Sequence, residues 1–241
     1  MIHRFSRIAS LLLLVPAVPA HAQTVSLEVT TDARERGISW SDGRPALEVR
    51  ASIPVSSAFD VDLRATTLRN SARHGGSELG LMVSPSFRLD MGGLSLSAGL
   101  DGHVFLDESR LNFVEASAGL DYSIGPARID AGVSYAPRQK AIGGDNLYLH
   151  AGAAIGVPGT PLTVYGGGGY TTGSTRNAVR AARLRPGGDA WDHYVGVEHS
   201  LMKFAVGLRY SDTTVSSNRI ASPFDDRHAG SRLAAYIRVT L

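Results

Sequence analysis

The chain has no cysteine, and no apolar stretch in it, the run near its start included, is long enough to form a membrane-spanning helix. Such a helix needs roughly 18 or more consecutive apolar residues. Without disulfides, a chain of 241 residues must gain its stability from an extended hydrogen-bonded framework or from a large core. Because 43% of the residues are nevertheless hydrophobic, the apolar side chains must be plentiful but dispersed.

An excess of charge of one sign is also lacking. The first 22 residues have the features of a signal peptide, namely a start containing Arg4 and Arg7, an apolar run over residues 8–18, and the small-x-small triplet at residues 20–22. We therefore expect cleavage before Gln23. Removing two of the 24 basic residues leaves 22 against 22 acidic residues, and this neutral balance gives no reason to expect a nucleic-acid partner.

Apolar residues recur at every second position in one segment after another, which is the pattern of strands with two unlike faces. Pro85 lies inside one such row, where we expect a bulge because proline removes a ladder donor. The rows predict a single-domain, antiparallel, up-and-down transmembrane β-barrel of about twelve strands over residues 23–241. They occupy residues 25–29, 47–53, 59–65, 79–89, 94–100, 114–124, 129–135, 147–155, 162–170, 191–197, 202–210 and 233–241.

The links between the rows alternate in length. Short turns rich in Gly, Pro and Ser alternate with longer links, such as residues 37–44, 171–189 and 211–230. Outer-membrane barrels have short periplasmic turns and longer extracellular loops. We therefore expect both termini on the periplasmic side and solvated, mobile loops on the other.

The two faces differ sharply in charge. The apolar rows contain no Asp, Glu, Lys or Arg, and His193 is their one ionisable residue. A soluble lipocalin-like barrel would show the same rows facing inward, so alternation alone leaves both arrangements open. The aromatic residues favour the membrane, because they lie near the strand ends, as in the belts at the two headgroup levels. These expected belt residues are Phe59, Phe87, Tyr122, Tyr135, Tyr170, Trp191, Phe204 and Tyr210.

This arrangement places the protein in the outer membrane of a Gram-negative bacterium. The expected partners are outer-membrane lipid and lipopolysaccharide, the barrel assembly machinery and small polar solutes. The last strand runs to the terminal residue, as is typical of outer-membrane proteins, although Leu241 stands where an aromatic residue is usual.

The first predicted hairpin resembles that of the TorF porin family. The similarity rests on the string Thr31-Asp32-Ala33-Arg34-Glu35-Arg36-Gly37-Ile38-Ser39, followed by Ser41-Asp42-Gly43 and Pro45-Ala46-Leu47. Ala33 and Glu35 stand where aromatic residues are expected. The resemblance covers about the first 25 residues after the signal peptide and implies a pore, without assigning functional residues.

The opposite rows are charged and would line the lumen. We expect this lumen to pass small polar solutes or ions; a closed structural or adhesin-type barrel, sealed by its own ion pairs, is the alternative. The candidate lumen residues are Glu48, Arg50, Asp62, Arg64, Glu115, Asp121, Arg209 and Arg238.

The link at residues 171–189 carries a basic group that could bind lipopolysaccharide phosphates or attract anions, since guanidinium forks suit phosphate. A solvated loop without a partner remains the alternative. The group is Arg176, Arg180, Arg183 and Arg185. An outer-membrane lipid hydrolase using His193 is a weaker possibility, because no serine nucleophile can be identified. We expect no enzyme activity, no cofactor and no metal site.

Overall fold

The computed structural model describes residues 24–215, 224 and 228–241, so the predicted signal peptide lies outside the described residues. Twelve strands form one closed barrel. They are β1 (Thr24–Thr30), β4 (Ala46–Ser56), β5 (Phe59–Thr67), β6 (Leu79–Met91), β7 (Leu94–Phe105), β8 (Phe113–Ile124), β9 (Ala127–Gln139), β10 (Gly144–Gly156), β11 (Leu162–Thr172), β12 (Ala190–Leu201), β13 (Phe204–Thr213) and β14 (Arg232–Thr240). Each of the twelve predicted rows lies on one of them.

Every neighbouring pair in the barrel is antiparallel, and the first and last strands close it. Leu27 of β1 lies opposite Val239 of β14, and Val29 lies opposite Ile237. Closure leaves no sheet edge with unpaired backbone groups, which is the condition for a sheet to sit in hydrocarbon. The predicted fold class is therefore confirmed.

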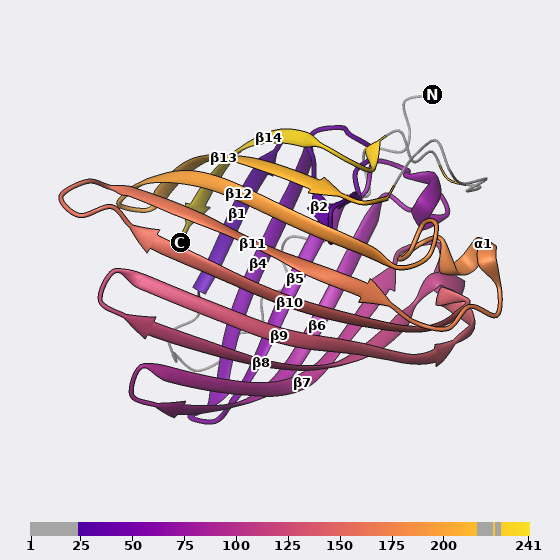
Figure 1. Ribbon diagram of the computed structural model, residues 1–241, viewed down its shortest axis with the longest axis horizontal. Coiled ribbons are helices and arrows are strands. Elements are labelled where there is room, and N and C mark those ends of the chain that lie inside the picture. Colours follow the sequence, from indigo (N-terminus) through magenta and orange to yellow (C-terminus); the bar gives the residue numbers. More distant parts are fainter. Residues whose placement is uncertain (1–23, 216–223, 225–227) are drawn as a thin grey trace.

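The two ends of the barrel differ, as Figure 1 shows. Short turns join the strands at one end, where β14 also finishes. The other end carries the long links, with the small hairpin β2 (Arg34–Glu35) and β3 (Ile38–Ser39) and the helix α1 (Ala178–Ala181). Three 3-10 turns lie there as well: η3 (Ala72–His74), η4 (Ser109–Leu111) and η5 (Lys140–Ile142). No helix in the described part of the chain is long and apolar enough to cross a membrane.

The apolar rows face outward. On β8, Leu120 is 39% exposed whereas Glu115 is 1% exposed, and Trp191 on β12 is 60% exposed. The eight expected belt residues all lie on this outer face, and two pairs of them are in contact across neighbouring strands with their rings tilted. A soluble barrel would bury these apolar rows, so the lipocalin-like alternative does not describe this chain.

The bulge expected at Pro85 is absent. Pro85 lies opposite Val61 of β5 in an unbroken register, and β6 keeps one register with β7 on both sides of a short unpaired stretch. The missing proline donor is therefore accommodated by leaving Ser84 and Pro85 unpaired with β7. The register shifts occur elsewhere, between Pro54 and Ser56 and between Gly144 and Asn146.

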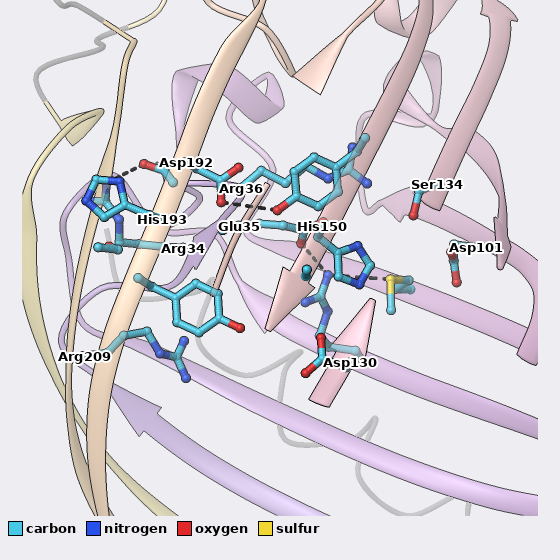
Figure 2. A pocket seen from close by; sticks show the side chains of 18 of the residues that line it. Arg34, Glu35, Arg36, Asp101, Asp130, Ser134, His150, Asp192, His193 and Arg209 are labelled. Atoms are coloured by element: carbon cyan, nitrogen blue, oxygen red, sulfur yellow. Dashed lines mark hydrogen bonds and ion pairs between the residues drawn. The ribbon is translucent and has the colours of Figure 1, made fainter. Parts of the chain in front are cut away.

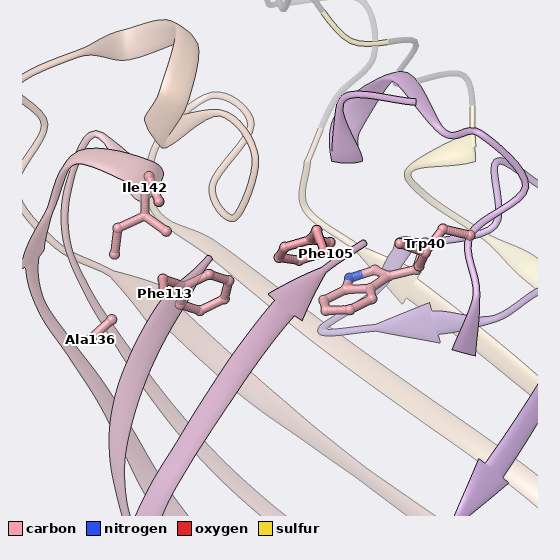
Figure 3. Packing of buried hydrophobic residues seen from close by; sticks show 7 residues of the cluster. Trp40, Phe105, Phe113, Ala136 and Ile142 are labelled. Atoms are coloured by element: carbon pink, nitrogen blue, oxygen red, sulfur yellow. The ribbon is translucent and has the colours of Figure 1, made fainter. Parts of the chain in front are cut away.

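Five of the long links, those that precede β4, β6, β8, β10 and β12, contribute to a cap at one end of the lumen, which corrects the expectation of solvated, mobile loops for them. Figure 3 shows Trp40 of the first link beside Phe105 of β7, with Phe113 and Ile142 completing the cluster. Each link with its adjoining strand ends supplies between one and three apolar side chains, so no link has a hydrophobic period of its own. Together they form the buried core of the described chain. This cap comprises Trp40, Leu68, Phe105, Phe113, Ala136, Ala141 and Ile142, with Leu111 and Leu184 packed against it.

Candidate functional site

The hairpin formed by β2 and β3 lies inside the barrel, and we call residues 34–39 the inserted hairpin. Its two-residue turn, Arg36-Gly37, has φ values of +50° and +73°, the pattern of a tight hairpin turn with both central residues left-handed. A Cβ at Gly37 would lie 2.8 Å from Cβ of Thr213 and 2.9 Å from Cβ of Asp192. Glycine is therefore required where the turn touches the barrel wall.

Arg36, at the tip of the inserted hairpin, is bonded to the barrel wall at β8, away from the strands that Gly37 touches. Its guanidinium donates two hydrogen bonds to Glu115 of β8, at 3.1 and 2.6 Å. It also lies 4.4 Å above the ring of Tyr148, and Nε2 of His103 is 3.3 Å from the same carboxylate. A non-glycine residue at positive φ costs roughly 1–3 kcal/mol, so these contacts must offset backbone strain at Arg36.

Glu35 forms the second tip contact, a 2.5 Å ion pair with Arg64 of β5. Burial would raise the pKa of Glu35, but Arg64, His103 and Arg36 hold it below its ordinary value. Burial would likewise lower the pKa of Arg36, and Glu115 raises it above its ordinary value. Both tip residues are therefore ionised at neutral pH, and the inserted hairpin is held by charges on two strands.

The base of the hairpin is equally fixed. Arg34 donates to Asp32 at 3.0 Å and to the backbone oxygens of His228 and Gly230 at 3.0 and 2.6 Å. Ser39 donates to the same carboxylate of Asp32 at 2.6 Å. The inserted hairpin is thus tied to the link that precedes β14 as well as to the wall.

A polar chamber of about 570 Å³ lies beneath the hairpin, as Figure 2 shows. Arg34, Glu35 and Arg36 form part of its lining, together with side chains from both sides of the barrel. A second cavity of about 590 Å³ shares Asp101 and Asp130 with it. This second cavity reaches the residues beside the short turn between β8 and β9. The lumen thus contains, in order, the cap, the inserted hairpin and two adjoining polar cavities.

The predicted lumen residues face this interior, and most are ion-paired. Arg50 donates to Glu48 at 2.5 Å, and Arg238 pairs with Glu198 at 2.5 Å. The remaining pairs are Arg64 with Glu35, Glu115 with Arg36, and Asp121 with Arg128, whose Nε donates at 2.6 Å. Arg209 has a tyrosine partner instead, since its Nε lies 3.4 Å from the hydroxyl of Tyr165. Asp62 forms no ion pair within the described residues. Whether these residues govern passage stays a prediction.

Large inward side chains lie flat against the wall over glycines. A Cβ at Gly196 would overlap the ring of Tyr165, and one at Gly207 would overlap the ring of Tyr236. The two tyrosine hydroxyls are 3.0 Å apart. Because the two glycines have no side chains, the tyrosine rings can lie against the wall there instead of extending across the lumen.

Substituting Gly207→Ala is expected to lower the free energy of unfolding by about 1–3 kcal/mol, the usual cost of overpacking. The three atoms nearest to the added methyl would all belong to the side chain of Tyr236. In a Tyr236→Ala background the same substitution should cost much less. Denaturant titration in lipid vesicles measures both values, and equal costs in the two backgrounds would contradict the packing described.

The basic group at residues 171–189 divides into two pairs. Arg183 and Arg185 are 3% and 4% exposed, because their guanidinium groups donate to backbone oxygens such as Ala141 at 2.9 Å and Gly173 at 2.7 Å. Burial and the charge of Arg73 lower the pKa of Arg183 to about 10, so it remains charged at neutral pH. These two residues are structural and unavailable to phosphate, which corrects the expectation for them. Arg176 and Arg180 are exposed.

His74 in the cap is buried against aromatic rings. It stacks on Phe105 at 4.9 Å and lies 4.7 Å from Trp40, and neither ring nitrogen has a hydrogen-bond partner within the described residues. Burial, Arg183, Arg73 and His103 lower its pKa well below 6.5. His74 is therefore neutral in the folded cap.

This burial predicts a loss of stability in acid. The unfolded chain takes up a proton at His74 near pH 6.5 whereas the folded chain does not, so unfolding becomes easier as pH falls below about 6.5 and is unaffected above it. The thermal midpoint should therefore drop more between pH 7.5 and pH 5 in the wild type than in His74→Phe, which keeps the stacked ring. Identical pH profiles would show that His74 is not the cause.

The site contains features that the sequence did not reveal. Residues 37–44 were expected to form a solvated loop at the end of the first hairpin, its insertion into the lumen was not predicted, and neither Arg36 nor Tyr148 was a candidate. The one signal was Glu35, a charged residue where the TorF resemblance expects an aromatic one. Within the described residues no group of three or more His, Asp or Glu side chains is placed to hold a metal ion. His193 lies on the outer face, with its ring 6.4 Å from that of Tyr210.

Solved structures with the same fold are outer-membrane porins and channels. The NanC porin aligns with a TM-score of 0.59 at 10% identity, covering 90% of this chain and 98% of that one. The KdgM porin gives 0.56 at 9% identity, with coverages of 90% and 98%. An outer membrane channel from Pseudomonas putida F1 gives 0.52 at 10% identity, with coverages of 93% and 96%. At such identities the similarity shows the fold, which is that of an outer-membrane barrel.

A comparison with curated proteins gives no sequence match. One family model, described as "Bacterial protein of unknown function (Gcw_chp)", matches residues 16–233. That match extends over most of the barrel and includes the inserted hairpin. The chain is therefore a member of the Gcw_chp family.

Proposed function

We propose that the protein is a porin-like channel that passes small polar solutes or ions through a narrow lumen restricted by the inserted hairpin. The observation that carries this proposal is the pair of adjoining polar cavities inside a barrel whose outer face is apolar. Twelve strands lie between the eight that side chains fill and the 16–18 that leave a wide channel. A restricted pore suits that size.

The TorF resemblance supports the same proposal from another direction. It rests on residues 31–47, and these include the inserted hairpin. We infer export with cleavage before Gln23, folding by the barrel assembly machinery, and an outer-membrane environment with lipopolysaccharide near Arg176 and Arg180. The closed barrel and the outward position of its apolar rows support the membrane environment, and the sequence of the first 22 residues is the support for the cleavage position.

Single-channel recording in planar lipid bilayers tests the proposal. The refolded protein, without its signal peptide, should give discrete conductance steps well below those of a wide porin, since the hairpin fills part of the lumen. Absence of steps above background, from protein whose folded state is verified by heat-dependent gel mobility, would refute the channel function.

A sealed barrel that acts through its loops is the second candidate. It is favoured by the packed cap and by the hairpin lock, which together cover one end of the lumen. Such a barrel would give no conductance in the wild type but would conduct once the inserted hairpin is removed. A barrel with a lumen blocked elsewhere would stay silent in both forms.

A further inference from the structure

The chamber beneath the inserted hairpin has two walls of opposite free charge. Arg209 uses only its Nε, for Tyr165, and Arg50 uses only its Nε, for Glu48. The terminal nitrogens of both have no hydrogen-bond partner within the described residues, and both side chains belong to the lining of the chamber. The Arg209 guanidinium also lies 5.7 and 5.4 Å from the rings of Tyr165 and Tyr236, and Glu28 is the acidic residue near both arginines. These nitrogens form a basic wall on β13 and β4.

The acidic wall is formed by Asp101 of β7 and Asp130 of β9. Neither carboxylate forms an ion pair or hydrogen bond within the part of the chain that the structure describes, and both line the two cavities. Ser134 and His150 lie beside them in the lining. Figure 2 shows Asp101 and Asp130 on different elements from Arg209, around the same open space.

One pair of these charges lies across the full width of the lumen, whereas Arg50 on β4 is three strands from β7 and Asp130 on β9 is four strands from β13. In the closed order of twelve strands, β13 and β7 are six strands apart in both directions, so Arg209 and Asp101 belong to opposite sides of the barrel. Free charges of opposite sign on separate, weakly polarisable walls produce a field across the chamber. An ion of one sign is attracted by one wall and repelled by the other. A solute that carries one positive and one negative group can be attracted by both walls.

The chamber also has the size and surface of a small-molecule site. Its volume of about 570 Å³ falls within the roughly 300–1,000 Å³ typical of ligand pockets. The rings of Tyr165 and Tyr194, which lie 6.2 Å apart, supply apolar surface in the lining. Arginine forks bind carboxylates in a fixed geometry, and aromatic faces tolerate cationic groups.

We propose that this chamber binds small zwitterionic solutes. The solute carboxylate lies toward Arg209 and Arg50, and the solute ammonium group lies toward Asp130 and Asp101. This inference deepens the proposed function, because it names the class of solute that the channel would select. Its biological role depends on the proposed channel function, but the binding experiment that tests it does not.

The test compares three probes of similar size by calorimetry on the refolded protein in detergent: 4-aminobutyrate, butyrate and butylamine. The wild type should bind 4-aminobutyrate at least ten-fold more tightly than either singly charged probe. Equal binding of the three probes, or no binding of 4-aminobutyrate, would overturn the proposal. Because this readout needs no ion flow, it is separate from the channel test.

Two variants assign the walls. Asp130→Asn should weaken the binding of 4-aminobutyrate about ten-fold, and this variant should bind butyrate more tightly than butylamine. Arg209→Gln should weaken the binding of 4-aminobutyrate by a similar factor, and this variant should bind butylamine more tightly than butyrate. Arg176→Gln, on an exposed loop, is the matched control and should bind as the wild type does. Wild-type-like binding by both wall variants would overturn the assignment. Conductance without zwitterion binding defeats this inference alone, and binding without conductance defeats the channel function alone.

Discussion

Replacing Arg36 by alanine is expected to raise the single-channel conductance several-fold. The substitution removes both hydrogen bonds to Glu115 and the contact with Tyr148. It leaves the buried Glu115 carboxylate without its arginine partner, a change that typically costs about 3–5 kcal/mol. The free energy that keeps the hairpin inserted falls accordingly, and the open lumen becomes populated. Planar-bilayer recording measures the change directly.

Two further variants separate this lock from a general loss of structure. Glu115→Gln should also raise conductance, and the double variant should add little, because the two residues form one contact. Replacing residues 34–39 by a short Gly-Ser link should give the largest conductance. The hairpin would not restrict the channel if that last protein conducted no more than the wild type.

An arginine on the outer face should be far more damaging than the same residue in the lumen. Leu120→Arg places a cation near the middle of β8 on the apolar side, where it should lower the free energy of unfolding by about 2–4 kcal/mol. Ser117→Arg, three residues earlier on the inner face, should have a much smaller effect on stability. Denaturant titration in lipid vesicles, read by heat-dependent gel mobility, gives both values.

The Ser117→Arg protein also serves as the matched control for folding. It adds the same side chain to the same strand and should reach the folded state while lowering conductance, since its guanidinium group enters the second cavity. Equal destabilisation by the two substitutions would mean that the two faces of β8 see similar surroundings. That outcome is incompatible with a lipid-facing apolar row.

The barrel was predictable because its signal is local and repeated. A period of two fixes which side chains share a face, and each of the twelve rows repeats the same choice, so the strands and their orientation follow from the sequence. The Pro85 bulge was wrong for a related reason. A proline can be accommodated by a short unpaired stretch within an unchanged register, and no local pattern distinguishes that solution from a bulge.

The inserted hairpin was not predictable from local pattern. Most of its residues are polar, and its second half belongs to the link at residues 37–44 that was expected to be solvated. Its insertion depends on Glu115, which is 79 residues from Arg36 in the chain. The cap was not predicted for the same reason, because Trp40, Leu68 and Ile142 come from separate links. The site therefore depends on contacts between distant segments, which a single sequence does not display.

Quenching of tryptophan fluorescence by brominated acyl chains tests the central claim most directly, since the chain has two tryptophans on opposite sides of the wall. Trp191 is 60% exposed on the outer face, and Trp40 is 9% exposed in the cap. In vesicles of brominated lipid, the Trp40→Phe protein should lose most of its emission and the Trp191→Phe protein should keep most of it. Strong quenching of Trp40, or none of Trp191, would contradict a barrel whose apolar face lies against hydrocarbon.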